Sequence, residues 1–571
     1  MFLVMTSRAG IEGKPILSQT RSFRLADQTT VQVSWDGSDL EWKENSGGWT
    51  LRQGIYMHGG LVPGVMRVEL EFHRQDMTLT TRVSSVSGVP VYYYESPSGD
   101  LVLGSRVQIL REAGVPIEAD AAVLPEYLTY RCLLAPATLF RNIKRVPQGG
   151  VLTFGFGAGR PDVRLVSLAD RIKLGDRNEG DLARHAASLN DCVGETIKPL
   201  AAIPDHVAML LSGGIDSSIL CRHAERSLGL RDTVSTGYPF EDAAKDLERQ
   251  YALTAAKAMG FNHRVYESTT PRYLAGLVES ISLVEAPVSH LQSACMHLLV
   301  QEGIDASRNV VLQGLGAGGC VGNFRNFLFI RDKPWARLFA TDPLFQLLKM
   351  VPSLTGRGRT LLGKLRDMRN RLPLDNPGNP IWKWHQYGDA DWICSHFKVS
   401  PLDIAARHIN RLNGLKAGSL YDTWALYSLL GDEEATLAIW SAIAAGSGKT
   451  FYFPFYDESF LQYAMSIPWS IKLGATENVI RKSMAREVGV PDFILNRRKA
   501  GFGIRRDDWA LEGGVFDPFA RLASDIVGEK EVRALRCRDP RKAMLFWNLL
   551  NYALWKRICV DGESPKSLYC E

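Results

Sequence analysis

The chain has 571 residues, of which 45% are hydrophobic, 9% aromatic and 23% charged. This length corresponds to roughly two large domains or three to four of ordinary size, and the composition excludes a wholly disordered chain. The 67 Lys and Arg against 62 Asp and Glu give a net charge of +5, too close to neutral to favour a nucleic-acid partner. No window approaches the roughly 18 uninterrupted apolar residues of a membrane-spanning helix, so we expect no membrane partner either.

The cysteines and the first residues indicate the compartment. Nine cysteines are scattered along the chain, none of them in a CxxC pair. An odd number and a wide scatter are typical of reduced thiols and argue against a disulfide scaffold or a zinc ribbon. The segment Met1–Arg8 is too short and wrongly flanked for a signal peptide. We therefore expect a cytoplasmic protein.

The first part of the chain is predicted to be rich in β-strands. Apolar and polar residues alternate along residues 30–34 and 66–72, which is the two-residue period of half-buried strands. We assign residues 1–168 to an N-terminal domain built of such strands. Further predicted strands, each next to a turn rich in Gly, Pro or Ser, lie at 91–94, 101–103 and 151–154.

From about residue 180 the pattern changes to short buried strands that alternate with helices. The apolar run Val207–Leu211 ends in Ser-Gly-Gly, as expected of a central parallel strand that leads into a loop. Such alternation predicts a doubly wound parallel sheet. We assign residues 182–571 to this second domain and the polar stretch 169–181 to a linker. The other predicted elements are strands at 233–237 and 310–312 and helices at 219–228 and 247–259.

The segment Ser212–Ser218, Ser-Gly-Gly-Ile-Asp-Ser-Ser, follows the apolar strand and opens a helix. Small residues let backbone N–H groups turn inward around an anion, and the helix N-terminus adds partial positive charge. A carboxylate beside phosphates, here Asp216, makes sense with a bridging Mg²⁺. The segment is not a Walker A loop, because Gly-Lys-Ser/Thr is missing. We therefore predict a phosphate site; the alternative is an ordinary glycine-rich turn.

This segment resembles the pyrophosphate loop of ATP pyrophosphatases, in particular that of the asparagine synthetase family. Other segments that resemble motifs of the family are 246–256, 453–457, 497–503 with Trp509 and, in the first domain, 91–105 and 147–150. The resemblance implies an α/β fold (α+β overall), with an N-terminal glutaminase-like β-sandwich and a C-terminal adenylating domain. The second domain is expected to combine the doubly wound parallel sheet with helical elaborations, and ATP and Mg²⁺ are the implied cofactors.

The resemblance also implies which residues bind ATP. Backbone at Leu211, Gly237 and Gly314 is expected to line the adenosine pocket, and Asp216 is expected to hold the metal. The residues expected at the phosphates are Ser212, Gly213, Gly214, Asp216, Ser217 and Ser218.

Three residues are candidates for the chemistry itself. Lys499 is expected to stabilise the negative charge that develops on the acyl oxygen and the leaving phosphate when an amine attacks an acyl-adenylate. The alternative for Lys499 is a solvated basic run. Glu433 and Glu434 are candidates for deprotonating the attacking amine, and the alternative for both is a solvated helix face.

Two departures from the family pattern indicate which member the chain resembles. A working glutaminase domain of this family has Cys as its first residue after removal of Met, whereas residue 2 here is Phe2. Glutamine is therefore not expected to supply the amine, and the substrate would carry it, as in β-lactam synthetases, carbapenam synthetases and lasso-peptide macrocyclases. The catalytic Tyr of the β-lactam-forming enzymes falls on Leu315, which argues against β-lactam chemistry.

A third departure concerns the metal. The family's loop Asp, usually a second carboxylate for Mg²⁺, falls on Gly318. This leaves two alternatives: a rearranged metal site, since Mg²⁺ is usually held by one or two carboxylates, or an inactive nucleotide-binding scaffold.

Residues 331–371 contain ten Lys and Arg against three Asp and Glu and look like an insertion relative to the family. A basic amphipathic face could hold an acidic or extended peptide, and the alternative is a solvated helical elaboration. His58 and His290 show no metal-ligand spacing and are expected to be structural.

Together these features predict an ATP-dependent, AMP-forming carbon–nitrogen ligase. Its substrate would be a peptide or small molecule that bears both a carboxylate and an amine. The preferred prediction is a lasso-peptide macrocyclase, which forms a macrolactam and has a leader peptidase as a partner. An asparagine synthetase-like or β-lactam-type ligase acting on a small molecule is the alternative.

Overall fold

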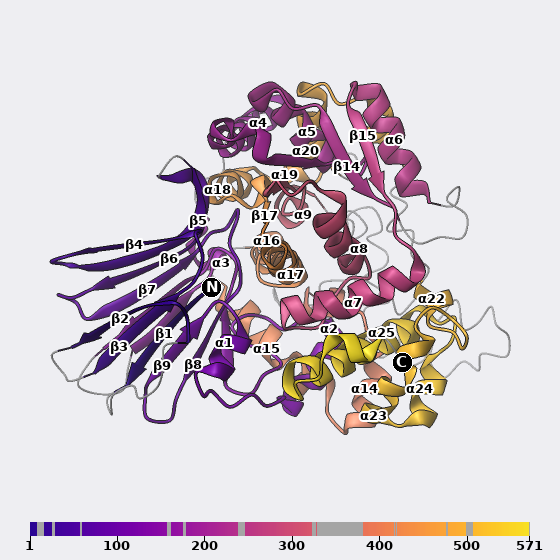
Figure 1. Cartoon of the computed structure of the whole chain (residues 1–571). Coiled ribbons are helices and arrows are strands. Elements are labelled where there is room, and N and C mark those ends of the chain that lie inside the picture. Colours follow the sequence, from indigo (N-terminus) through magenta and orange to yellow (C-terminus); the bar gives the residue numbers. More distant parts are fainter. Residues whose placement is uncertain are drawn as a thin grey trace.

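The computed structural model describes residues 1–7, 16–25, 29–57, 60–156, 162–174, 179–237, 246–322, 327, 381–415, 417, 419–474, 478–497 and 506–569. An antiparallel part formed by the first strands lies beside a larger, mainly helical part built around a parallel sheet (Figure 1). The N-terminus lies where the two parts meet. Among the described residues no helix is long and apolar enough to cross a membrane, and the eight cysteines are free thiols.

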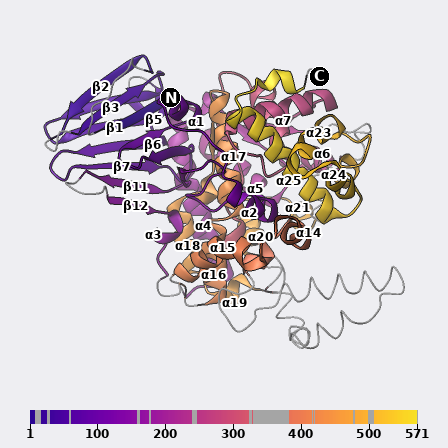
Figure 2. The same cartoon turned by 90° about the horizontal axis from the view of Figure 1, so that it is seen from below.

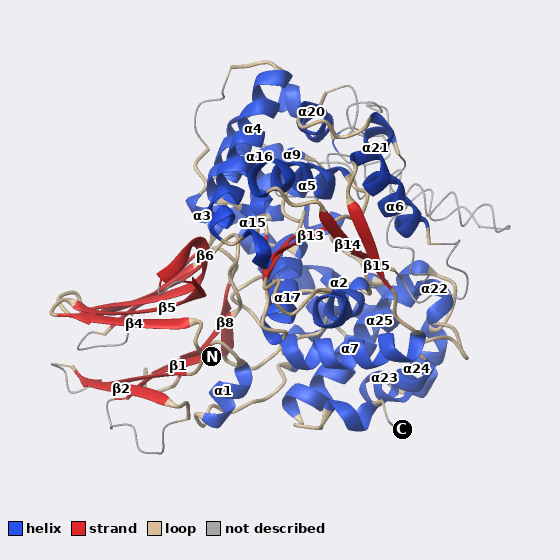
Figure 3. Ribbon diagram, turned by 45° about the horizontal axis from the view of Figure 1, so that its top comes forward, coloured by secondary structure: helices blue, strands red, loops and turns tan. Residues whose placement is uncertain are grey.

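The N-terminal part is a sandwich of two antiparallel six-stranded sheets, seen as two stacked layers in Figure 3. The strands of the first sheet, in spatial order, are β10 (Ile143–Val146), β8 (Val91–Glu95), β9 (Leu101–Gly104), β1 (Phe2–Ser7), β3 (Thr30–Trp35) and β2 (Gln19–Arg24). Those of the second are β12 (Asp162–Val166), β11 (Val151–Gly155), β7 (Thr78–Val83), β6 (Gly60–His73), β5 (Gly48–Met57) and β4 (Leu40–Asn45).

The two sheets enclose an apolar core because alternate residues of each strand point to the same face. Phe2 and Val4 of β1 face this core and are fully buried. Aromatic rings continue the core from one sheet to the other. The ring centroids of Trp35 in β3 and Trp42 in β4 are 5.1 Å apart, and those of Trp42 and Trp49 in β5 are 4.9 Å apart, in stacked geometry.

The second part contains a five-stranded parallel sheet. Its spatial order is β15 (Asn262–Tyr266), β14 (Asp232–Thr236), β13 (Val207–Leu210), β16 (Val310–Leu312) and β17 (Thr450–Tyr452). The chain starts in the middle strand, β13, and later strands are added on both sides, which is the doubly wound arrangement. Because β13 and β16 pair in parallel, the loops that follow both strands emerge at the same edge of the sheet.

Helices surround this sheet and extend away from it. Figure 2 shows the last helices grouped near α7, on the side of the molecule away from the sandwich. The helices before the parallel sheet are α1 (Val107–Glu112), α2 (Leu124–Tyr130), α3 (Leu168–Arg171) and α4 (Leu182–Ile197). Those up to β17 are α5 (Ile215–Leu228), α6 (Leu247–Met259), α7 (Thr270–Val284), α8 (Gln292–Leu298), α9 (Gly318–Val321), α13 (Ile381–Trp384), α14 (Ala390–Phe397), α15 (Pro401–Gly414), α16 (Leu420–Ser428) and α17 (Asp432–Gly446). After it come α18 (Glu458–Ser466), α19 (Trp469–Lys472), α20 (Val479–Glu487), α21 (Asp492–Asn496), α22 (Arg506–Trp509), α23 (Ala520–Val527), α24 (Glu529–Leu535) and α25 (Pro540–Trp555).

The two parts are joined by buried polar contacts as well as by apolar packing. The backbone N–H of Phe453, which follows β17, donates to the carbonyl of Val86 at 2.9 Å. The buried carboxylate of Glu285, at the end of α7, accepts hydrogen bonds from the first N–H groups of α1, with 2.7 Å to Val107 N. Such contacts orient the sandwich relative to the parallel sheet.

The fold class predicted from the sequence is confirmed: a two-sheet N-terminal part and a helix-surrounded, doubly wound parallel sheet. Three details differ. Helix α5 begins at Ile215 rather than 219, because Gly214 is already extended and serves as its N-cap. The first residues of the predicted linker 169–181 belong to the short helix α3, capped by Ser167 and Asp170. Strands β15 and β17, which complete the sheet, were not predicted. The domain limits 1–168 and 182–571 stay a prediction.

Candidate functional site

The loop after β13 has the geometry of an anion site. The N–H of Leu211 is still bonded to the sheet, donating to Val234 O at 3.0 Å, and the chain then turns through Gly213 with a φ of +68°. Gly214 is the N-cap residue of α5, and no side chain accepts a hydrogen bond from the first N–H groups of this helix. The first N–H groups of a 14-residue helix are therefore available to a ligand.

Side chains of the loop hold its shape. Ser217 Oγ accepts from the N–H of Ser212 at 3.2 Å and lies 3.1 Å from Ser212 Oγ, while Ser218 is fully buried with a hydroxyl that makes no hydrogen bond. A Cβ on Gly213 would come within 2.5 Å of the carbonyl of Tyr251 in α6. Glycine is required there because the loop backbone lies directly against α6.

Asp216, in the first turn of α5, presents a free carboxylate oxygen. Its Oδ2 accepts a hydrogen bond from Arg481 Nη1 of α20 at 2.8 Å, whereas the buried Oδ1 has no hydrogen-bond partner. Mg²⁺ bound together with nucleotide phosphates commonly uses one or two carboxylates and completes its shell with phosphate oxygens and water. The unpaired Oδ1 of Asp216 fits such an ion. No described group of three His, Cys, Asp or Glu side chains could hold a metal without the substrate.

The loop after β16 packs against the first loop. A Cβ on Gly314 would lie 3.0 Å from Ser217 N and 3.3 Å from Asp216 Cβ, so the two loops are in contact. Further along the second loop, the N–H of Gly318 donates to Glu433 Oε1 of α17 at 3.2 Å. A carboxylate from another helix therefore lies beside Gly318, where the resemblance predicts the family's loop Asp.

The two candidate glutamates lie in different surroundings. Burial raises the pKa of Glu433 above its usual value, and the neighbouring Asp216 carboxylate raises it further, while the Gly318 N–H and Arg481 oppose the shift. Glu434 is buried and faces the sandwich, where both of its oxygens accept from Arg145 at 2.7 Å. Neither residue lies on a solvated helix face. Of the two, Glu433 faces the phosphate loop.

The segment that follows α21 also reaches the phosphate loop. The Arg497 guanidinium lies 4.4 Å from the ring centroid of Tyr251 and 3.5 Å from a carboxylate oxygen of Glu248, both on α6. It is also 3.5 Å from the position of a Cβ on Gly214. Three segments that resemble family motifs, 212–218, 246–256 and the start of 497–503, therefore meet at one place.

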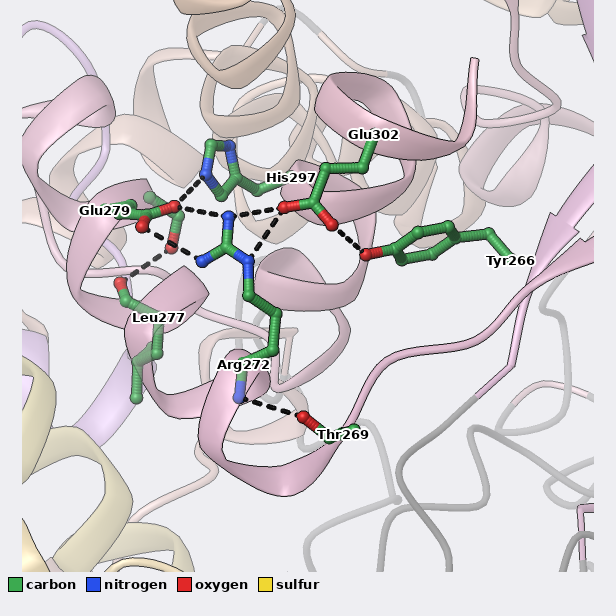
Figure 4. Close-up of polar contacts among 8 residues, drawn as sticks. Tyr266, Thr269, Arg272, Leu277, Glu279, His297 and Glu302 are labelled. Atoms are coloured by element: carbon green, nitrogen blue, oxygen red, sulfur yellow. Dashed lines mark hydrogen bonds and ion pairs between the residues drawn. The ribbon is translucent and has the colours of Figure 1, made fainter.

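The edge strand of the parallel sheet, β15, is fixed by a polar network. Gly237, expected at the adenosine pocket, donates its N–H to the carbonyl of Tyr266 at 2.7 Å. Figure 4 shows the Tyr266 hydroxyl bonded to Glu302, and Arg272 of α7 placed between Glu302 and Glu279. Glu302 lies in a π-helical turn, Leu299–Gly303, directly after α8. The network therefore ties the end of β15 to α7 and to this turn.

Sequence reasoning missed Arg481. Helix α20 carries other basic residues, Lys482 and Arg486, and nothing in the sequence marks Arg481 as the one that contacts Asp216. Lys499, the insert 331–371 and His58 lie outside the described residues. His290 is a structural residue, as expected: its Nε2 is 3.0 Å from Thr436 Oγ1, and burial lowers its pKa to about 4.

Comparison with known proteins agrees with this geometry. Residues 204–548, more than half of the chain, match the family described as asparagine synthase. The chain is 22% identical over 511 residues to a Mycobacterium tuberculosis protein assigned as a glutamine-hydrolyzing asparagine synthetase, covering 83% of this chain and 74% of that protein. It is 22% identical over 502 residues to glutamine-hydrolyzing asparagine synthetase 1 of Bacillus subtilis, with the same coverage. The chain belongs to the asparagine synthase family, whose members are ATP-dependent, AMP-forming carbon–nitrogen ligases.

Proposed function

We propose that this chain closes a macrolactam ring in a peptide, like the ring of a lasso peptide. The observation that carries the proposal is the pairing of an uncapped phosphate loop at Ser212–Ser218 with Glu433, whose carboxylate bonds to Gly318 on the adjoining loop. This arrangement suits amine attack on an acyl-adenylate. The amine would come from the substrate, because Phe2 offers no thiol and its side chain is buried in the sandwich core.

The reaction would have two steps. A side-chain carboxylate of Asp or Glu in the peptide attacks the α-phosphorus of ATP, the bond to the pyrophosphate oxygen breaks, and pyrophosphate leaves. The peptide's α-amine then attacks the acyl carbon, the bond to the AMP oxygen breaks, and the amine's proton passes to a base. The amide closes the ring, and one water's mass is lost from the peptide.

Each candidate residue has a role in this scheme. Ser212–Ser218 would hold the pyrophosphate, and Mg²⁺ at Asp216 would neutralise phosphate charge. Glu433 would accept the amine's proton, for which its raised pKa suits it better than an ordinary exposed glutamate. Lys499 would stabilise the charge that develops on the acyl oxygen. Holding the amine near the acyl carbon would supply a large part of the rate enhancement.

The preference for a peptide rests on two features of the sequence. Leu315 occupies the position of the catalytic Tyr of β-lactam-forming enzymes, and the basic insert 331–371 offers extra surface for a chain longer than an amino acid. A leader peptidase that exposes the α-amine would be a natural partner. An inactive nucleotide-binding scaffold is the second candidate, favoured by Gly318 in place of Asp, although Glu433 brings a carboxylate to that position.

The test is mass spectrometry of a linear core peptide incubated with the protein, ATP and Mg²⁺. The expected result is a product lighter by one water, with AMP and pyrophosphate released in equal amounts. Lys499→Ala and Asp216→Ala should abolish ring closure, while Lys530→Ala, an exposed lysine of α24, should not.

Other results would contradict the proposal and assign a different function. Asparagine formed from aspartate and ammonium would assign the small-molecule alternative, and ATP binding without turnover of any substrate would assign the scaffold. ADP as the product would contradict adenylation. Cyclisation by Lys499→Ala at the wild-type rate would contradict the mechanism.

A further inference from the structure

Glu433 is the middle one of three carboxylates at the start of α17, and arginines from residues before the parallel sheet bind both of its neighbours. Asp432 accepts two hydrogen bonds from Arg131, at 2.8 and 3.2 Å, and Glu434 accepts two from Arg145, at 2.7 Å each. Arg131 immediately follows α2, and Arg145 lies in β10. Both arginines therefore come from residues before the parallel sheet, whereas the carboxylates lie on a helix 301 and 289 positions later in the sequence.

The geometry of an α-helix explains how these two contacts fix the direction in which Glu433 points. Successive residues of an α-helix point about 100° apart around its axis, so Asp432 and Glu434 point to two sides and Glu433 lies between them. A guanidinium bound to each neighbour with two hydrogen bonds resists rotation of the helix about its axis, because the planar fork fixes both distance and orientation. Rotation is the motion that would move Glu433 away from Gly318.

The surroundings show that these contacts are built into the fold. Glu434 and Arg145 are buried, and Gln148 N adds a third hydrogen bond to Glu434 at 2.8 Å. The Arg131 guanidinium also lies 3.8 Å from the ring centroid of Tyr387, whose hydroxyl is 3.5 Å from Asp432 Oδ2. Separating either arginine from its carboxylate would leave a buried charge without a partner. These pairs therefore stabilise the observed orientation of α17.

We propose that Arg131 and Arg145 are positioning residues that hold Glu433 against the loop at Gly318, so that residues preceding the parallel sheet set the geometry of the ligase site, Arg145 from strand β10 of the sandwich and Arg131 from the end of α2. This assigns a task to a domain that has no thiol nucleophile at Phe2. The inference rests on the proposed role of Glu433 as the base, but the contact it explains, Gly318 N–H to Glu433 Oε1, can be followed without any substrate.

The experiment is hydrogen–deuterium exchange of the full-length protein, resolved to the amide of Gly318 by fragmentation within segment 313–322. Glu433→Ala removes the acceptor directly and should speed exchange at Gly318 by about tenfold. Arg145→Met should produce a similar increase, and Arg145→Lys a smaller one, because lysine keeps the charge but not the two-bond fork.

Arg171→Met is the matched control. Arg171 also pairs through two nitrogens with a glutamate of the second part, Glu458 of α18, but that pair does not touch α17. Exchange at Gly318 should stay at the wild-type rate in this variant. If the thermal melt shows that Arg145→Met does not fold, the double variant Arg145→Met with Glu434→Met removes the pair without stranding a charge and should give the same fast exchange.

Wild-type exchange at Gly318 in the folded Arg145 variants, with fast exchange in Glu433→Ala, would overturn the proposal. So would equal exchange in Glu433→Ala and wild type, because the contact itself would then be absent. With a peptide that the protein cyclises, Arg145→Met should lower kcat at least tenfold and leave the KM for ATP unchanged. A failed cyclisation assay would count against the proposed function only, since the exchange experiment needs no substrate.

Discussion

Arg481 of α20 donates a hydrogen bond to Asp216 of the phosphate loop at 2.8 Å, and it leaves the other carboxylate oxygen of Asp216 free. The guanidinium thus reduces the negative charge that approaching phosphates meet, while one oxygen remains for a metal. This pairing joins a helix late in the sequence to the first turn of α5. It supports a prediction about nucleotide binding.

We expect Arg481→Met to weaken ATP binding by roughly ten- to a hundredfold, because the phosphates would then meet the Asp216 carboxylate without the guanidinium that offsets its charge, and interactions with a charged group contribute about 1.5–3 kcal/mol. Isothermal titration with ATP, with and without Mg²⁺, measures the change. Arg486→Met is the control, since Arg486 lies on the same helix but is exposed and pairs loosely with Asp492 at 3.6 Å. Equal ATP affinity in the Arg481 variant and the wild type would mean that this guanidinium does not face the nucleotide.

Gly213→Ala should also weaken ATP binding, by more than about tenfold. Its φ of +68° is in the left-handed region, and the added Cβ would lie 2.5 Å from the backbone of Tyr251, so the loop must move. Gly229→Ala, at the other end of α5, has a similar φ of +70° but nothing within 4 Å. That control should cost about 1–2 kcal/mol of stability and leave ATP affinity unchanged. Equal effects of both variants on ATP affinity would contradict a specific role for the close approach at Tyr251.

Glutamine should not be hydrolysed by this protein. The prediction follows from Phe2, whose side chain is fully buried between the sheets and carries no nucleophile. A coupled assay for glutamate, run with glutamine in the absence of ATP, is the measurement. Glutamate release above that of a heat-inactivated sample would show that the sandwich keeps a glutaminase activity by another nucleophile.

Acid should destabilise the network that joins α7 to the end of β15. The hydrogen bond from His297 and the paired Arg272 hold the pKa of Glu279 down to about 2, against about 4.3 in an unfolded chain. A depressed carboxylate pKa stabilises the fold above the unfolded value, and the contribution is lost as pH falls from about 4.3 to about 2. Glu279→Gln should flatten the pH dependence of the free energy of unfolding in this window.

Glu279 can change the free energy of unfolding by at most about 1.4 kcal/mol per pH unit, the slope for one proton. Solvent around this partly exposed carboxylate reduces the slope. Thermal melts of the wild type and Glu279→Gln between pH 3 and pH 6 test the prediction. Parallel curves for the two proteins would contradict it. Glu118→Gln, an exposed glutamate of the N-terminal part, is a control that should leave the curve unchanged.

The sequence by itself determined the class of the fold, and it predicts a phosphate site at the loop. Alternation along the first strands, the apolar run before Ser212 and the glycines after it are local signals, so residues 1–168 and Ser212–Ser218 could be interpreted without coordinates. The same holds for Phe2, because the absence of a thiol at one position needs no structure. Strand β17 was not predicted although β16 is equally short, because Thr450–Tyr452 lacks the continuous aliphatic run that marks Val310–Leu312 as a buried strand.

Only the tertiary structure decided which charged residues share the site. Glu433 and Glu434 are neighbours with the same chemistry, but the helix turns one toward Gly318 and the other toward Arg145. Arg481 reaches Asp216 across 265 positions of sequence. Contacts of this kind depend on how helices pack around the sheet, and a single sequence carries no local pattern for packing between segments so far apart.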